Sequence, residues 1–208
     1  MLQVDGVRLF VGLPLDAISY DCNSINHARA IAAGLKALKL LGVEGVELPI
    51  WWGIVEKETM GEYDWSGYLA IAEMVQKVGL NLHVSLCFHG SEKPNIPLPK
   101  WVSQIGESQP NIFFTDKSGQ HYKECLSLAV DDLPVLDGKT PVQVYQAFCE
   151  SFKSSFSPFM GSTIKVNILH SSTRCIPIVI WSFRIYMTDN FLICCHIAEH
   201  FHGFRTRW

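Results

Sequence analysis

Two tryptophans and a histidine have the types and positions that suit the binding of a sugar. Trp51 and Trp52 end one short apolar segment, and His89 ends another. An aromatic ring offers an apolar face, and an imidazole can exchange hydrogen bonds with hydroxyl groups. The alternative interpretation is structural: the tryptophans pack beneath such a site, and His89 is a histidine with a satisfied partner at the end of a strand.

Four glutamates could, as a pair, supply a general acid and a general base. They are Glu47, Glu56, Glu58 and Glu92, and two of them would have to flank one shared substrate to transfer its protons. We expect instead that Glu56, Glu58 and Glu92 are solvated loop charges. Glu47 lies in an apolar segment, where we expect it to have a local partner. The sequence therefore predicts no catalytic residue among them.

One cluster near the end of the chain has residue types that bind metals: Cys194, Cys195, His196, His200 and His202. The spacing of His196 and His200 would place both imidazoles on one face of a helix, which suits zinc. The residue after His196 is not glutamate, so the H-E-x-x-H protease motif is absent. We interpret this cluster as a chance result of the local composition, and we predict no metal site and no cofactor.

The segments that must position these residues alternate between strands and helices. Buried strands are predicted at 7–13, 46–50 and 80–88, and amphipathic helices at 24–41 and 65–78. Such alternation requires a parallel sheet with helical crossovers, since parallel neighbours cannot be joined by a tight turn. The fold class is therefore α/β.

The second half of the sequence continues this alternation less regularly. A short helix is predicted at 100–104, a loop with a polar turn at 111–132, and a long helix at 141–156. Thr140 suits the N-cap of that long helix, and Pro141 suits its first turn. A fourth strand is predicted at about 163–169.

Composition excludes several classes of protein. Apolar residues make up 48% of the chain and charged residues 18%, so a buried core is expected. The net charge is −3, and the sequence has no run of like charges that would form a basic patch. These two features argue against a nucleic-acid partner. No uninterrupted apolar segment is long enough for a membrane span. Seven scattered cysteines without a leader segment predict free thiols in a reducing compartment.

Many segments of the sequence resemble, in order, the N-terminal part of plant β-amylases. They include LPLDAIS, GVEGVELPIWWGIVE, YDWSGY, LNLHVSLCFH, NIPLPKWV and KECLSLAVDDLPVLDGKTPVQVY. The resemblance implies the family's (β/α)8 barrel, of which this chain would form a partial TIM barrel with the first three to four βα units. Residues 1–164 are then the N-terminal part of the barrel, and 165–208 are a divergent tail with no assigned domain.

The family removes maltose from the non-reducing ends of α-1,4-glucans with inversion, and this chain departs from it where the chemistry should be. The family's acid lies in a Gly-Glu-Leu-Arg-Tyr-Pro-like segment after the fourth strand, and this chain has neither that segment nor the one that carries the base. The glycine-rich lid motif after His89 is replaced by GSEKP, and Pro49 stands where the family has an acidic sugar ligand. His89 is the sugar-contact position that remains.

The resemblance therefore implies a non-catalytic β-amylase-like protein that regulates starch and polysaccharide breakdown. Its partners would be α-1,4-glucan (starch) or another amylase, and its expected location is the plastid. Because we find no transit peptide in this chain, the cytoplasm is the alternative location. Two other functions stay open: an active β-amylase that releases maltose, and a truncated splice product without function, which would aggregate.

Overall fold

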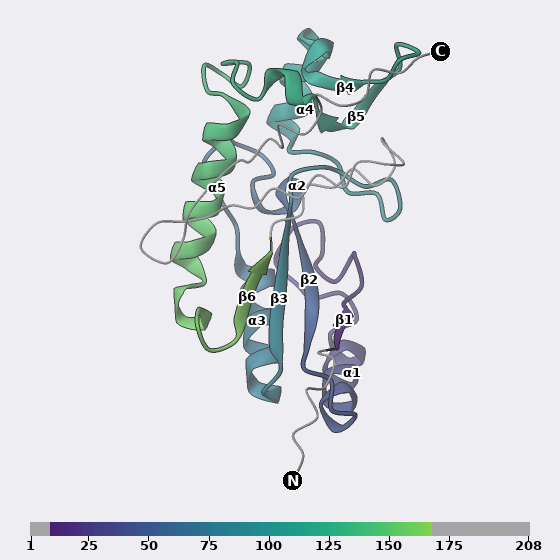
Figure 1. Cartoon of the computed structure of the whole chain (residues 1–208), viewed down its shortest axis with the longest axis vertical. Coiled ribbons are helices and arrows are strands. Elements are labelled where there is room, and N and C mark those ends of the chain that lie inside the picture. Colours follow the sequence, from purple (N-terminus) through teal and green to yellow (C-terminus); the bar gives the residue numbers. More distant parts are fainter. Residues whose placement is uncertain (1–8, 168–208) are drawn as a thin grey trace, which may run out of the picture.

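The computed structural model describes residues 9–167, and in this part of the chain four parallel strands form one sheet (Figure 1). These strands are β1 (Phe10–Gly12), β2 (Gly45–Trp51), β3 (Asn81–Cys87) and β6 (Ile164–Asn167). Their order in the sheet is β1-β2-β3-β6. The predicted alternation, including the fourth strand, is confirmed. Within residues 9–167 the sheet does not close into a barrel.

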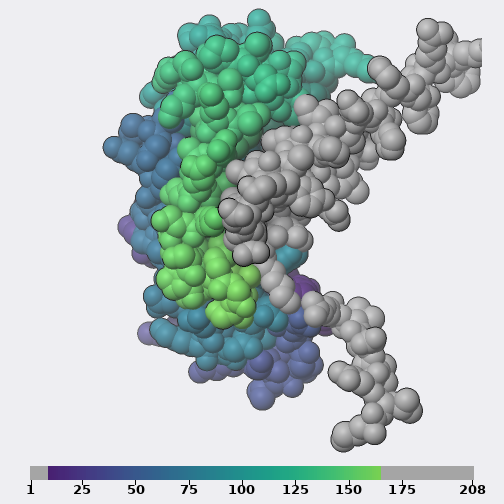
Figure 2. Space-filling view, turned by 60° about the vertical axis from the view of Figure 1, so that its left-hand side comes forward, coloured from purple at the N-terminus to yellow at the C-terminus, as the bar shows by residue number. Residues whose placement is uncertain are grey.

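Helices supply the crossovers between these strands. They are α1 (Ala28–Leu40) after β1, α3 (Ser66–Val78) after β2, and α5 (Pro141–Ser155) before β6, with shorter helices α2 (Trp52–Val55) and α4 (Lys100–Ser108). Single 3-10 turns lie at Pro110–Ile112, Leu128–Val130 and Ser157–Phe159. In Figure 2 the green surface of α5 joins the teal region above it to the blue region of α3 below. None of the helices in residues 9–167 is long and apolar enough to cross a membrane.

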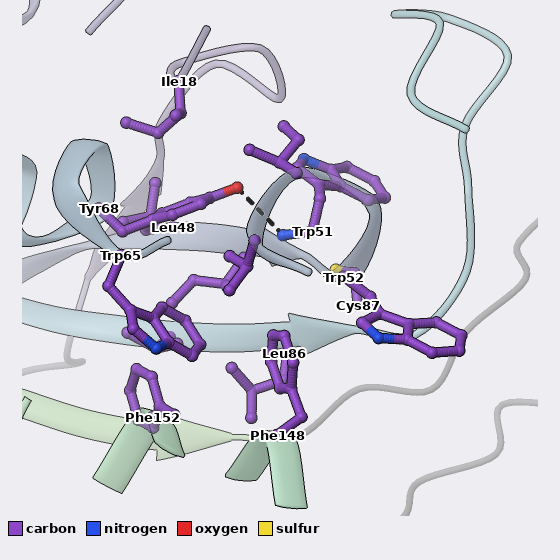
Figure 3. Packing of buried hydrophobic residues seen from close by; sticks show 14 of the residues in the cluster. Ile18, Leu48, Trp51, Trp52, Trp65, Tyr68, Leu86, Cys87, Phe148 and Phe152 are labelled. Atoms are coloured by element: carbon purple, nitrogen blue, oxygen red, sulfur yellow. Dashed lines mark hydrogen bonds between the residues drawn. The ribbon is translucent and has the colours of Figure 1, made fainter. Parts of the chain in front are cut away.

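One face of the sheet packs against the helices and forms the core. Alternate residues of a strand point to one face, and on this face Val46, Leu48 and Ile50 of β2 are 0% exposed. Figure 3 shows this packing, with side chains from β2, β3, α3 and α5 meeting in one apolar cluster; its labelled members include Leu48, Leu86, Tyr68, Phe148 and Phe152.

The opposite face carries polar side chains. Glu47 lies beside His83 in the register of β2 and β3, and Pro49 lies beside Ser85. Glu47, Pro49 and His83 are half-buried. This face therefore holds groups that can exchange hydrogen bonds with a ligand.

The ends of two helices follow the sequence prediction. Thr140 caps α5 through a reciprocal pair of hydrogen bonds: the Gln143 backbone N–H donates to Thr140 Oγ1 (3.2 Å), and the Thr140 N–H donates to Gln143 Oε1 (3.0 Å). Gly79 ends α3 with a φ of 74°, a conformation that favours glycine. Local sequence therefore determines where these helices begin and end.

Two regions differ from the sequence prediction. The segment 111–132, predicted as a loop, contains the antiparallel strands β4 (Phe113–Thr115) and β5 (His121–Leu126). The predicted polar turn joins them, because Asp116 Oδ1 accepts from the Ser118 and Gln120 backbone N–H groups. Three residues of FFT are too few to show a period in the sequence, so β4 is recognisable only by its pairing with β5.

The second difference is α2, which begins directly at Trp52, between the predicted strand at 46–50 and the predicted helix at 65–78, where no helix was predicted. Gly53, its second residue, lies so close to the chain after β3 that an added Cβ would overlap the Pro97 carbonyl. The loop that follows β2 is therefore packed tightly against the loop that follows β3.

Candidate functional site

The structure brings His89 and Trp51 together at the carboxyl end of the sheet. Trp51 is the last residue of β2 and pairs in register with Cys87, the last residue of β3. His89 follows two residues later, and its ring meets the Trp51 ring edge-on, with centroids 5.5 Å apart and planes at 88°. Two of the three predicted sugar-contact residues therefore lie side by side.

The Trp51 side chain is buried beneath His89 and is not open to solvent. Its exposed fraction is 4%, and its Nε1–H donates to the Leu15 carbonyl over 2.8 Å. The Trp51 backbone N–H donates to the Tyr68 hydroxyl over 3.1 Å, a bond drawn in Figure 3. These bonds fix the ring as a support for His89.

Trp52 lies deeper, with 0% of its surface exposed. Its ring meets those of Phe88, Trp101 and Tyr145 edge-on, at centroid distances of 6.0, 5.6 and 5.4 Å. Since no face of the ring is open, the geometry favours packing over sugar stacking for Trp52. Sugar contact by this residue stays a sequence prediction.

His89 is half-buried and has one ring nitrogen engaged. Its Nδ1 lies 2.8 Å from the Gly90 carbonyl, which can only accept a hydrogen bond, so Nδ1 carries the proton and Nε2 keeps a lone pair. Burial lowers the pKa of His89, an effect that the Gly90 hydrogen bond opposes. The imidazole is therefore neutral at pH 7, with Nε2 as an acceptor for a hydroxyl group.

Three of the four glutamates agree with the prediction. Glu47 accepts a hydrogen bond from the Ser85 hydroxyl at 2.7 Å, which confirms the local partner. Glu58 is an exposed loop charge, and both of its oxygens accept from Lys100 Nζ, at 2.6 and 2.9 Å. Glu92 is also exposed, in the loop after β3.

The prediction for Glu56 was wrong, because its carboxylate is not solvated but 0% exposed. It accepts hydrogen bonds from Trp52 Nε1 (2.6 Å) and from the Gly61 backbone N–H (2.5 Å). Its backbone carbonyl accepts from Trp101 Nε1 at 3.1 Å. Burial raises the pKa of Glu56, an effect that the two donors and the charge of Lys139 reduce.

Glu56 thereby orients two tryptophan rings of the aromatic cluster below His89. The signal that could have revealed this role is the four-residue spacing of Trp52 and Glu56, which places both on one side of a helical turn. The role of Glu56 is structural, since both of its carboxylate oxygens already accept hydrogen bonds from the protein.

Pro49 offers the site no hydrogen bond, since its side chain is apolar and its nitrogen has no proton. In the part of the chain that the structure describes, no three His, Cys, Asp or Glu side chains are grouped so that they could hold a metal ion. The cluster from Cys194 to His202, interpreted as composition, lies outside the described residues.

The fold and the strand-end site define the class: the chain belongs to Glycosyl hydrolase family 14, whose model matches residues 10–178. This confirms the resemblance inferred from the sequence. The match extends past residue 164, and the division of the chain at that point stays a prediction.

Particular relatives are similar over the same region. Inactive beta-amylase 9 of Arabidopsis thaliana is 67% identical over 162 residues, which are 78% of this chain and 30% of that protein. Beta-amylase 2, chloroplastic, of Oryza sativa subsp. japonica is 42% identical over 164 residues, 76% of this chain and 29% of the relative. This chain thus spans about 30% of the length of these relatives.

A solved structure gives the same result for the fold. The catalytic domain of the β-amylase from Paenibacillus polymyxa superimposes with a TM-score of 0.63 at 28% identity, over 77% of this chain and 36% of that one. The sheet of this chain therefore corresponds to part of a β-amylase catalytic domain.

Proposed function

We propose that this chain is a non-catalytic β-amylase-like protein that binds α-1,4-glucan and regulates starch breakdown. The observation that carries the proposal is that three carboxyl groups near the sheet are already bonded to other side chains of the protein. Glu47 is bonded to Ser85, Glu56 is buried against Trp52, and Glu58 is paired with Lys100. An inverting glycosidase needs two carboxyl groups facing each other across the sugar, about 6.5–9.5 Å apart.

The names of the relatives support the ligand class and the lack of turnover. One relative is named an inactive beta-amylase and another a chloroplastic beta-amylase. In this proposal the sheet is the first half of the family's eight-stranded (β/α)8 barrel, and His89 Nε2 accepts a hydrogen bond from a glucose hydroxyl. The relative named chloroplastic supports a plastid location, and another amylase is a further partner in this proposal.

The alternative function is maltose release, and the relative named beta-amylase 2 is the observation that favours it. Reducing-sugar release from soluble starch separates the two functions. We expect no turnover from the purified chain. Turnover that survives purification and disappears in Glu47→Gln or Glu92→Gln would overturn the non-catalytic proposal.

Binding is tested by co-sedimentation of the full chain with starch granules. We expect His89→Ala to weaken retention, because it removes the acceptor at the end of β3. His121→Ala, an exposed histidine on β5, is the matched control and should be retained like the wild type. Absence of retention for the wild type would remove the glucan-binding role.

A further inference from the structure

A hollow of about 350 Å³ lies between the loop that follows β1 and the loop that follows β2. Ile54 and Val55 of α2 lie at its base but are only 3% and 1% exposed, so they offer a ligand almost no surface. One wall is Tyr63, whose half-buried ring stacks on Trp65 with centroids 6.3 Å apart. Ligand pockets for small molecules are typically about 300–1,000 Å³. His89 does not line this hollow, so it is separate from the strand-end site.

The rim of the hollow carries hydrogen-bonding groups that the fold leaves available. Thr59 and Glu62 line it, and their side chains make no hydrogen bond or ion pair to residues 9–167. The Tyr63 hydroxyl likewise has no partner in that range. Burial raises the pKa of Tyr63 to about 12, so the hydroxyl is a donor at neutral pH. Asp64 Oδ1 accepts hydrogen bonds from the Ser66 backbone N–H and hydroxyl, whereas Oδ2 accepts none within residues 9–167 and is available to a ligand.

One of the carboxylates around the hollow is already paired with lysines. Glu58 is neutralised by Lys100 at 2.6 Å and by Lys57 at 3.7 Å. Within the described ranges no three acidic or imidazole groups are grouped as metal ligands. Acceptors beside the aromatic wall of Tyr63 suit a molecule with apolar C–H faces and hydroxyls at its edge. A pyranose ring has both.

We propose that this hollow, named here the Tyr63 pocket and lined by residues 54–55, 57–59 and 62–64 with Asp21, is a second glucan-binding site. The ligand class rests on the proposed function, whereas the site itself does not. C–H groups of one glucose ring lie on the Tyr63 ring, and its hydroxyls bond to Glu62 and the Tyr63 hydroxyl. Two sites on one chain would hold a glucan strand more tightly than either alone, through effective concentration.

The experiment is a titration of the isotopically labelled full chain with maltotriose, followed by backbone amide NMR. We expect chemical-shift changes in residues 57–64. These changes should persist in His89→Ala, because that residue belongs to the other site.

Variants of the rim sharpen this test. Glu62→Gln should weaken maltotriose binding at the Tyr63 pocket by about tenfold, the effect of one hydrogen bond to a charged group. Tyr63→Phe keeps the packing against Trp65 and should weaken binding several-fold. Glu107→Gln, an exposed glutamate on α4, is the matched control and should leave the dissociation constant unchanged.

Each other outcome decides against the Tyr63 pocket. Shift changes confined to the surroundings of His89 would refute the second site and leave the proposed function standing. No shift change anywhere would refute both. If spermidine gives the same changes at residues 57–64 and salt abolishes them, the pocket binds cations and is not a sugar site.

Discussion

The two faces of the parallel sheet differ in how side chains are held in place. On the helix-facing side, Val46, Leu48 and Ile50 are fully buried among apolar neighbours. On the opposite side, Glu47 and Pro49 are half-buried, and Glu47 is held by one hydrogen bond to Ser85. Apolar burial is the main source of folding free energy, so the first face supplies stability, whereas the second carries side chains that stay accessible to solvent.

The largest expected effect tests this difference directly. Leu48→Ala should lower the free energy of unfolding by about 2–5 kcal/mol, because it leaves a cavity in a closed core. The neighbouring Pro49→Ala, on the opposite face, should change it by less than about 1 kcal/mol. Urea unfolding of both variants measures the contrast. Equal losses would show that the two faces contribute alike.

Glu56→Ala should come next, with a loss of about 2–4 kcal/mol. The substitution leaves the Trp52 indole N–H and the Gly61 backbone N–H without their buried acceptor. Glu56→Gln keeps an amide oxygen as acceptor and should lose less. The same unfolding measurement checks both, and a Glu56→Ala protein as stable as the wild type would contradict the role assigned to this carboxyl.

Ser85→Ala should have a smaller effect, about 0.5–1.5 kcal/mol. It removes the donor to Glu47, but that carboxylate is half-buried and can be hydrated from the open face. Ser103→Ala on α4 is the control for a serine outside the sheet. A loss as large as that of Leu48→Ala would mean that the Glu47 face is as closed as the core.

The most gradual effect is a pH dependence from Glu56. Its pKa in the folded state is raised above 4.5, so the folded state holds the proton more tightly than the unfolded state. The free energy of unfolding should therefore fall as the pH rises from 4.5 through the raised pKa. Glu56→Gln should lose this component. Subtracting the two pH profiles cancels other groups, such as Asp131, whose pKa burial raises to about 6.

Much of the fold could be predicted because its signals are local. Apolar periodicity marked the helices, and Thr140 and Gly79 marked helix ends. Strand β4 gave no such signal, since its three residues are defined by pairing with β5. The sequence also predicted no helix at α2, because a single helical turn is shorter than any recognisable period.

The candidate site was predictable in position but not in orientation. Strand ends in a parallel sheet meet at one edge, and the neighbouring ends of β2 and β3 bring Trp51 and His89 together there. The inward turn of Trp52 and Glu56 depends on partners distant in sequence, such as Trp101 and Tyr145. A charged residue after an apolar segment is usually solvated, so the sequence favoured the wrong environment for Glu56.

The order of the sheet, β1-β2-β3-β6, also has a consequence for synthesis of the chain on the ribosome. Each new strand of this sheet joins the edge formed by the sheet's previous strand, while β4 and β5 pair separately. The pairs β1–β2 and β2–β3 can therefore form while residues beyond β3 are still being added, and no existing pair has to open to admit β6. The edge of β3 waits longest for its native neighbour, because β4, β5 and α5 are synthesised before β6, and an unpaired strand edge favours aggregation.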